Sequence, residues 1–398
     1  MHKFTKTLIA VGFSALLATP VWAQTAPLPE SFFAETADST FSINYDDLDA
    51  VLQASVLSSG LPSRKKATAS SAATGTRMKN NSNTLTAASG NRFSFEEYKN
   101  NAQMRQIVSN IRNSLQNLPS EAQLSDFSNK EQLAYWLNLY NITVIDEIIQ
   151  VYPRKNLQDF VVGEDGLLQR KLLKVAGVEL SLNDIQFEIL QKKFPDQPQI
   201  IYGLYQGYIG SPSIRARAYT AANVSRMLNM NANEFINSNR GTYPVGKDGF
   251  RVAGFYQRNA SYFPNFHQDL KNHLLEYLHE DDKAALEQTA ELTANIEDWS
   301  ITDIYGTTRN FGGGAANNSA ALLDAFAQGP DRGPDNNEVA NIGLMADTLA
   351  SRSVTYGRFA PDQALKIKEL QLRRANQAGA VTVTDLESDE KKKDENKE

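Results

Sequence analysis

The sequence predicts an α+β fold that is mainly helical. Two observations support this class. Apolar residues recur at helical spacing over long segments, of which residues 129–151 are the best example. Runs with strand character are short and lie scattered between the helical segments. Dominant helices with a few dispersed strands are typical of the α+β class.

The first 23 residues have the features of a secretory signal peptide. Lys3 and Lys6 form a basic start, residues 8–17 are apolar, and Val21-Trp22-Ala23 resembles a cleavage site. The apolar run is shorter than the roughly 20 residues that a spanning helix needs, and no later stretch approaches that length. The sequence therefore predicts a periplasmic or secreted protein that begins near Gln24 and has no membrane span.

Composition excludes several classes of function. The chain has no cysteine, which rules out thiol catalysis, thiolate metal sites and disulfides, so an exported form must be held by burial alone. Loss of Lys3 and Lys6 on cleavage would leave 38 basic and 46 acidic residues, a change in net charge from −6 to −8. An acidic chain is a poor nucleic-acid binder, so we expect no nucleic acid among its partners.

The N-terminal part combines a leader, one helix and a flexible insert. Residues 24–40 are predicted to be a loose leader, and a helix is expected at about Tyr45–Leu57. Residues 60–91 are too poor in apolar side chains to offset the entropy of ordering, so they are predicted to be a flexible insert. Helical patterning resumes at about Gln103–Leu118.

The best helix in the sequence starts at Ser128 and ends before Pro153. Ser128 and Glu131 form the S-x-x-E pattern of a capping box. One buried stripe is predicted, made of Leu133, Leu137, Tyr140, Val144 and Ile148. Asn138 and Asn141 flank this stripe, where an amide without a hydrogen-bond partner would destabilise the fold by about 1–3 kcal/mol. They either anchor loops to the core or line a site; we expect an anchor at Asn141 and a site at Asn138.

A hairpin, further helices and two more strands complete the core region. Lys171–Val175 and Val178–Leu180 are predicted strands joined by a tight turn at Ala176-Gly177. Ser181 with Asp184 repeats the capping box and opens a helix to about Phe194, and Thr220 is predicted to cap a helix that runs to Asn237. Helical segments are expected within residues 255–291, with strands at residues 250–252 and 292–299.

Residues 41–305 are interpreted as the core domain, and residues 306–398 as an extension of it. Residues 306–379 are predicted to be loop-rich and to end in helices at about Glu338–Ala350 and Pro361–Ala378, with Gly379 as a C-cap. The run Gly312-Gly313-Gly314 lacks the strand and helix start that would flank a phosphate-binding loop. Residues 380–398 are charged and almost free of apolar side chains, so a disordered tail is expected.

The histidines argue against a metal centre. After the predicted cleavage site only His267, His273 and His279 remain, and their spacing of six places them about 240° apart around a helix. No HExxH or similar pattern is present. We therefore expect no metal and no cofactor, while a site built only from carboxylate oxygens stays open.

Five patches in a fixed order resemble domain of unknown function 547. They are NKEQLAYWLNLYN at Asn129–Asn141, SLNDIQFEIL at Ser181–Leu190, IYGLYQGYIGSPSIR at Ile201–Arg215, AYT at Ala218–Thr220 and DWS at Asp298–Ser300. The resemblance spans about Phe41–Tyr305. It implies a thiol-hydrolase-like scaffold whose typical members carry cysteines at the positions of Gln206 and Ser211 and histidines at those of Asp146 and Phe187. All four are replaced, so this chain is identified as a cysteine-free version of the domain.

Catalysis by other groups is left open. Ser211 could act as a nucleophile, but Phe187 supplies no base, and Pro212 has no N–H to lend to an oxyanion hole. Gly210-Ser211-Pro212-Ser213 is more simply a turn. A carboxylate pair such as Asp146 with Asp184 is the other possibility.

The favoured hypothesis is a non-catalytic, exported domain that binds a cell-envelope ligand or protein in a groove around Tyr205–Arg215. Tyr202, Tyr205 and Tyr208 suit a carbohydrate or peptide groove, and equally the rim of a core. Arg215 and Arg217 could bind a carboxylate or pair with Asp184 or Asp298. The candidate binding residues are Asn138, Asp146, Asp184, Tyr205, Gln206, Ser211 and Arg215. The alternative is a periplasmic hydrolase or transferase that uses Ser211 or a carboxylate pair.

Overall fold

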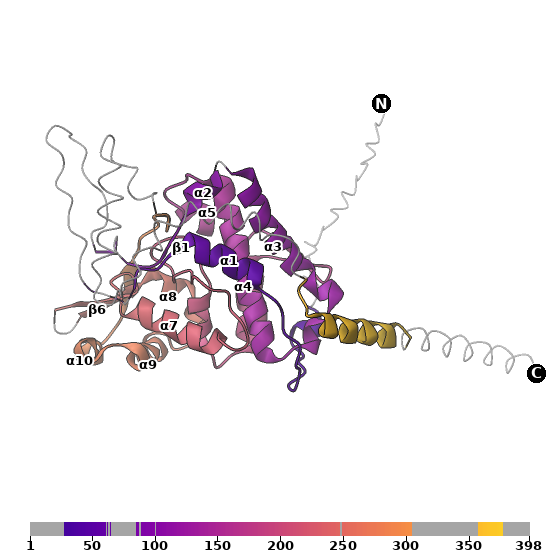
Figure 1. Ribbon diagram of the computed structural model, residues 1–398. Coiled ribbons are helices and arrows are strands. Elements are labelled where there is room, and N and C mark those ends of the chain that lie inside the picture. Colours follow the sequence, from indigo (N-terminus) through magenta and orange to yellow (C-terminus); the bar gives the residue numbers. More distant parts are fainter. Residues whose placement is uncertain are drawn as a thin grey trace, which may run out of the picture.

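One long helix, α4 (Asn129–Val151), lies at the centre of the fold (Figure 1). The structure is a computed structural model that describes residues 28–60, 62, 64, 85–86, 89–99, 101–246, 249–304 and 357–376. Helices dominate and the strands are short, so the predicted α+β class is confirmed. Within the described ranges, no helix combines the length and apolarity that crossing a bilayer requires.

Helix α4 is buried on all sides. Every residue from 131 to 146 is buried, so the prediction of a single buried stripe was wrong. A helix that is covered all round belongs to the centre of a core rather than to its surface. Its polar side chains, Asn138 and Asn141 among them, therefore have to find partners inside the protein.

The start of α4 is capped as predicted, but the second half of the capping box differs. The Ser128 hydroxyl accepts a hydrogen bond from Glu131 N–H at 3.4 Å. The carboxylate of Glu131 does not turn back to Ser128; it accepts from Ile43 N–H at 2.9 Å. The helix start is thereby tied to the N-terminal segment of the chain.

Residues 28–40 are anchored to the core by Phe32 and by hydrogen bonds, so the prediction of a loose leader was wrong for this part. Phe32 in η1 (Glu30–Phe32) is buried and meets Trp136 edge to face at 5.2 Å between ring centroids. Thr36 Oγ1 donates to Ser125 O at 2.9 Å, and Ser39 Oγ donates to Asp126 O at 2.6 Å. The segment before residue 28, including the predicted signal peptide, lies outside the described residues.

Three helices and a small two-stranded sheet lie beside α4 (Figure 1). They are α1 (Asp46–Ser55), α2 (Phe95–Lys99) and α3 (Ala102–Glu121), with β1 (Val56–Leu57) antiparallel to β2 (Arg92–Phe93). The short helices η2 (Leu124–Asp126) and α5 (Gln158–Val162) flank the two ends of α4 in sequence. Within the predicted flexible insert, Thr86, Ser89 and Asn91 are buried, so its C-terminal end is ordered.

The predicted hairpin is present. Strands β3 (Leu173–Val175) and β4 (Val178–Leu180) pair antiparallel, and Ala176 and Gly177 have φ values of 49° and 84°. Two successive positive φ values are what a tight hairpin turn of this kind requires. The helix after it is opened by Ser181 and Asp184 as predicted, but its centre is a π-helix, η3 (Asp184–Leu190), followed by α6 (Gln191–Lys193) and η4 (Pro198–Gly203).

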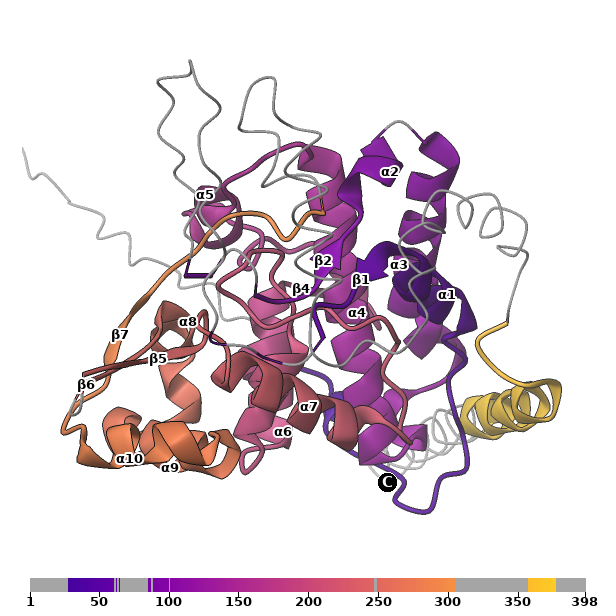
Figure 2. The ribbon, with the colours of Figure 1, turned by 60° about the vertical axis from the view of Figure 1, so that its left-hand side comes forward.

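A second, smaller core lies under a three-stranded sheet. Its strands are β5 (Thr242–Val245), β6 (Gly249–Ala253) and β7 (Thr293–Ile296), with β6 antiparallel to β5 and parallel to β7. Its helices are α7 (Val224–Ile236), α8 (Gly254–Arg258), η5 (Ala260–Tyr262), α9 (Phe266–Tyr277) and α10 (Glu280–Gln288). Figure 2 shows α9 and α10 beside this sheet and α7 between it and α4.

Helix α7 begins four residues after Thr220, which does not cap it. Thr220 N–H donates instead to Asn223 Oδ1 at 2.9 Å, and residues 221–223 form a turn before the helix. The prediction of a Thr220 cap was therefore wrong. The cause is competition: Asn223 bonds the backbone locally and delays the helix start.

Residues 357–376 dock onto the N-terminal segment. The guanidinium of Arg358 binds both carboxylate oxygens of Asp47, at 2.9 and 2.8 Å, and donates to Asn44 O at 2.8 Å. Phe359 stacks on Phe127, and residues 361–376 are helical as predicted. The predicted helix at Glu338–Ala350, the glycine run at 312–314 and the tail at 380–398 lie outside the described residues.

Candidate functional site

The tyrosines of segment 201–215 belong to the core. Tyr202, Tyr205 and Tyr208 are at most 1% exposed, and burial raises the pKa of each phenol. Tyr205 Oη is hydrogen-bonded to Thr302, and Tyr208 Oη lies 2.9 Å from Arg258 Nη2. The prediction that Tyr205 lines a groove was wrong, because this segment runs through the middle of the fold rather than along its surface.

Ser211 is placed in a buried turn, and none of the described residues is hydrogen-bonded to its hydroxyl as a base. Its side chain is 1% exposed, and its hydroxyl donates to Tyr208 O at 2.7 Å. The backbone carbonyl of Ser211 accepts from Arg240. A nucleophilic serine needs its proton directed at a base, whereas here the proton is directed at a carbonyl oxygen. The arrangement is the turn that the sequence also allowed.

The carboxylates of Asp146 and Asp184 are held in two separate ion pairs. Asp146 accepts from Ser109 Oγ and from Arg112 Nη1, both at 2.9 Å. Asp184 accepts from Lys171 Nζ at 2.6 Å and from Ser181 N–H at 2.5 Å. Neither carboxylate contacts the other, so the structure does not bring them together as an acid and base pair.

The pKa of Asp184 reflects its role as a helix cap. Partial burial alone would raise the pKa of this carboxyl, but the hydrogen bonds from Lys171 and Ser181 outweigh it and lower the pKa. A carboxylate with a lowered pKa is a weak base. Asp184 is therefore suited to opening the helix rather than to accepting a proton in catalysis.

Asn138 and Asn141 use both ends of their amides on the backbone. Asn138 Nδ2 donates to Tyr219 O at 2.7 Å, and its Oδ1 accepts from Tyr219 N–H at 2.9 Å. Asn141 bridges Gly203 O and Tyr205 N–H, both at 3.0 Å. The void beside them holds only about 10 Å³, room for a single water at most. Both residues are anchors, which corrects the expectation that Asn138 lines a site.

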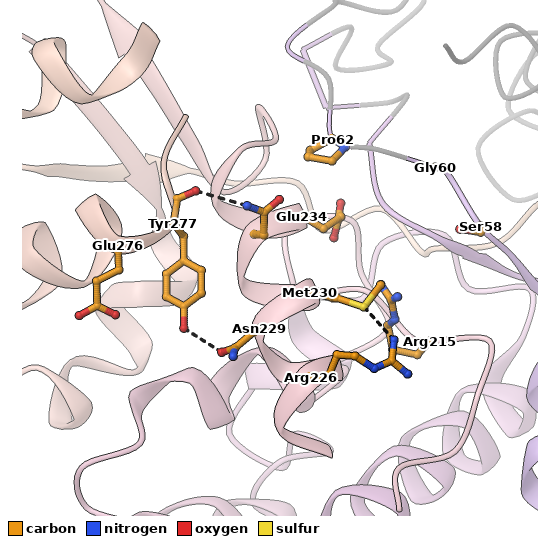
Figure 3. A pocket seen from close by; sticks show the side chains of 11 residues that line it. Ser58, Gly60, Pro62, Arg215, Arg226, Asn229, Met230, Glu234, Glu276 and Tyr277 are labelled. Atoms are coloured by element: carbon orange, nitrogen blue, oxygen red, sulfur yellow. Dashed lines mark hydrogen bonds between the residues drawn. The ribbon is translucent and has the colours of Figure 1, made fainter. Parts of the chain in front are cut away.

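Arg215 does line a large open cleft, which we call the α7–α9 cleft (Figure 3). Its volume is about 990 Å³, at the upper end of the size range of ligand sites. Its lining residues are Ser58, Gly60, Pro62, Arg215, Arg226, Asn229, Met230, Asn233, Glu234, Glu276 and Tyr277. Most of them come from one face of α7 and from the end of α9.

The cleft carries two arginines that are free to bind an anion. Arg215 Nη1 donates to the neutral Asn231 at 3.1 Å, and Arg226 Nη1 lies 3.5 Å from the sulfur of Met230. Within the described part of the chain neither arginine has a carboxylate partner. Figure 3 shows both on one side of the cleft and Glu276 on the other, so the cleft is divided in charge.

The walls and floor of the cleft are fixed by hydrogen bonds. Tyr277 Oη donates to Asn229 Oδ1 at 3.0 Å, which joins α9 to α7 (Figure 3). At the floor, Glu234 forms an ion pair with the buried Arg240. Arg240 also donates to Ser213 Oγ at 3.0 Å, so the floor is tied to segment 201–215. The ion pair with Arg240 therefore already neutralises the carboxylate of Glu234.

Gln206 lines a second, smaller hollow, which we call the amide cavity. Its volume is about 140 Å³. Five carboxamides line it, namely Gln169, Asn183, Gln186, Gln206 and Asn259, together with Val162, Leu168, Phe187 and Arg258. Two of the four positions at which the family resemblance implies reactive residues, Gln206 and Phe187, therefore meet in one cavity, whereas Asp146 and Ser211 do not line it.

Metal-ligating side chains do not cluster within the described residues. No group of three or more histidine or carboxylate side chains comes together there in a way that could hold a metal ion. The buried imidazole of His273 is hydrogen-bonded to Tyr202 Oη at 3.0 Å, and burial lowers its pKa to about 4. His273 is thus a neutral core residue at physiological pH.

The residues of the α7–α9 cleft other than Arg215 were not predicted as site residues. A local signal for them exists: Arg226, Asn229, Met230 and Asn233 recur at helical spacing on the face of α7 opposite its buried side chains. Met230 is 43% exposed, an apolar residue on a face that should be polar. That face becomes a cleft only because α9 and the residues Ser58, Gly60 and Pro62 stand beside it, which sequence spacing does not reveal.

Comparison with known proteins gives a match to one family model over part of the chain and no function. Residues 124–236 match the family described as Protein of unknown function, DUF547, which confirms the resemblance for this part of the chain. The match covers α4, the hairpin, η3, segment 201–215 and α7. A search of curated proteins and a search of solved structures each found no match.

Proposed function

We propose that the protein is exported and acts as a non-catalytic binding protein for a carboxylate-bearing ligand of the cell envelope. The site is the α7–α9 cleft. The observation that carries the proposal is the pair of arginines, Arg215 and Arg226, which line one open cleft without a carboxylate partner among the described residues. Guanidinium groups bind carboxylates in a geometry that lysine cannot reproduce.

The rest of the cleft suits a peptide. Asn229 and Asn233 carry amides that can pair with a peptide backbone, and Met230 and Tyr277 offer apolar surface to side chains. Glu276 on the opposite side can bind an ammonium group. A short peptide with a free carboxylate at one end and an amine at the other matches this distribution of charge.

The absence of turnover rests on the surroundings of the residues that could act in catalysis without a cysteine. The Ser211 proton is directed at a carbonyl oxygen, and Asp146 and Asp184 are each neutralised by a different cation. The hydrolase alternative would need one of these groups to be free. It predicts turnover of peptidoglycan fragments, peptides or esters that is lost in Ser211→Ala or Asp146→Asn.

Calorimetric titration with a matched pair of peptides tests the binding proposal. Tetra-alanine with a free C-terminus should bind about 10–150-fold more tightly than tetra-alanine carboxamide, because a charge-assisted bond contributes about 1.5–3 kcal/mol. The variant Arg226→Gln should lose most of this difference. Arg373→Gln, which changes an arginine outside the cleft, is the matched control and should behave as wild type. Equal affinity of the two peptides would overturn the proposal.

A further inference from the structure

The amide cavity is distinct from the α7–α9 cleft and has a different chemical character. The two share no lining residue. Among the residues that the structure describes, no aspartate, glutamate or lysine lines the amide cavity; Arg258 is the one charged residue of these that does, and it is paired with Glu297 at 2.7 Å. A ligand with net charge would lose its hydration there without gaining a counter-ion. The cavity therefore selects for neutral groups.

The back of the cavity is rigid. Gln186 donates to Asn259 Oδ1, and Asn259 Nδ2 donates in turn to Phe255 O at 2.7 Å. Gln206 Oε1 accepts from Tyr208 Oη at 3.0 Å, and the guanidinium of Arg258 lies 4.5 Å from the centre of the Trp299 ring. Side chains locked in this way present fixed donors and acceptors, which lowers the entropy that binding costs.

Hydrogen-bonding capacity remains unused around the cavity. The side chains of Asn183 and Gln169 bond to no residue that the structure describes. The Nε–H of Arg258 is buried, and within the described ranges it too has no acceptor. Each carboxamide offers two donors and one acceptor, so these groups together match a ligand that both donates and accepts hydrogen bonds.

The opening of the cavity lies at its less buried residues. Gln169 is exposed, and Asn183 and Phe187 are half-buried. Asn183 is the N-cap of the π-helix η3 and Phe187 lies within it; this form of helix is rare and occurs often at functional sites. The ring of Phe187 together with Leu168 and Val162 adds an apolar wall.

We propose that the amide cavity binds one edge of a neutral hydroxylated ring, a pyranose sugar. Hydroxyl groups both donate and accept, which matches the carboxamides and the unused N–H of Arg258. The C–H face of a pyranose is apolar and matches Phe187. A volume of about 140 Å³ holds about four to five water-sized groups at roughly 30 Å³ each, enough for several hydroxyls but not for a whole disaccharide.

Saturation-transfer NMR on the full chain tests this site without reference to the peptide cleft. Methyl glucoside, N-acetylglucosamine, galactose and mannose are the neutral probes, and glucuronate is the charged match for glucose. At least one neutral sugar should receive saturation, strongest at its ring protons, and glucuronate should bind at least tenfold more weakly than methyl glucoside. Removal of one amide in Asn183→Ala should weaken binding about three- to tenfold. Phe187→Ala should reduce the transfer to the ring protons.

The control is Asn272→Ala, which removes an exposed amide on α9 that does not line the cavity and should leave sugar binding unchanged. Loss of sugar binding in Asn183→Ala with tetra-alanine affinity unchanged would support a second, separate site. No saturation of any neutral sugar would overturn the proposal. Transfer that is equal for glucuronate and methyl glucoside, or that survives both cavity variants, would overturn it as well.

Discussion

Replacing Asn138 by aspartate should destabilise the protein strongly, because this amide holds Tyr219 by both the N–H and the C=O of its backbone. The carboxylate keeps the acceptor and loses the donor, so Tyr219 O is left buried opposite a negative charge. The lost bond contributes roughly 0.5–1.5 kcal/mol and the unsatisfied carbonyl roughly 1–3 kcal/mol. We therefore expect the free energy of unfolding to fall by about 2–4 kcal/mol at neutral pH.

The loss should become smaller in acid. Burial at position 138 would raise the pKa of the introduced carboxyl above its unfolded value of about 3.9. The folded state then holds a proton at pH values at which the unfolded state does not, so the variant loses stability as the pH rises through the raised pKa. Below that pH the protonated carboxyl can again donate to Tyr219 O.

Urea unfolding followed by tryptophan fluorescence, at neutral and at acid pH, measures both effects. Asn272→Asp makes the same chemical change on the exposed surface of α9 and should alter stability by less than about 0.5 kcal/mol. An Asn138→Asp protein as stable as this control would refute the anchoring role. Weaker tetra-alanine binding with unchanged stability would refute it too and would return Asn138 to the site.

Three further predictions concern stability and the candidate nucleophile. Burial lowers the pKa of His273 to about 4, so between about pH 6.5 and 4 the unfolded state binds more protons. Stability should therefore fall by up to about 3 kcal/mol as the pH drops through this window, and His273→Gln should lose that part of the pH dependence of urea unfolding. Ser211→Ala should lower the free energy of unfolding by about 0.5–1.5 kcal/mol in the same assay and leave tetra-alanine affinity unchanged. Weaker peptide binding by this variant would place the hydroxyl in the site. Arg358→Ala should lower the free energy of unfolding by about 3–5 kcal/mol, because it breaks a nearly buried ion pair. The control Arg373→Ala, at an exposed arginine, should lower it by less than about 0.5 kcal/mol.

The elements with strong local signals could be predicted from the sequence. The N-cap at Ser128, the hairpin turn at Ala176-Gly177 and the capping box at Ser181 depend on neighbouring residues, and all three are present. The predictions that failed depend on packing. The stripe on α4 was too narrow because helices and loop segments together cover all its sides, and Phe32 turns a polar leader into part of the core.

The candidate site could be predicted only in part, for the same reason. Every third residue from Tyr202 to Tyr208 is aromatic, a pattern that fits a groove and a core equally well until the neighbours are known. Of the residues proposed from the sequence, Arg215 lines the cleft and Gln206 lines the amide cavity. The partners that give these two a chemical setting, such as Tyr277 and Asn259, come from distant segments, so no spacing in the sequence points to them.

The central claim is that Arg215 and Arg226 form a carboxylate-binding cleft, and NMR of the arginine side chains tests it most directly. Titration of the labelled protein with tetra-alanine should shift the Nε–Hε signals of Arg215 and Arg226, while the signal of the exposed Arg373 stays in place. The carboxamide form of the peptide should leave all three signals unchanged. Signals of Arg215 and Arg226 that do not move, or that move equally with both peptides, would contradict the account.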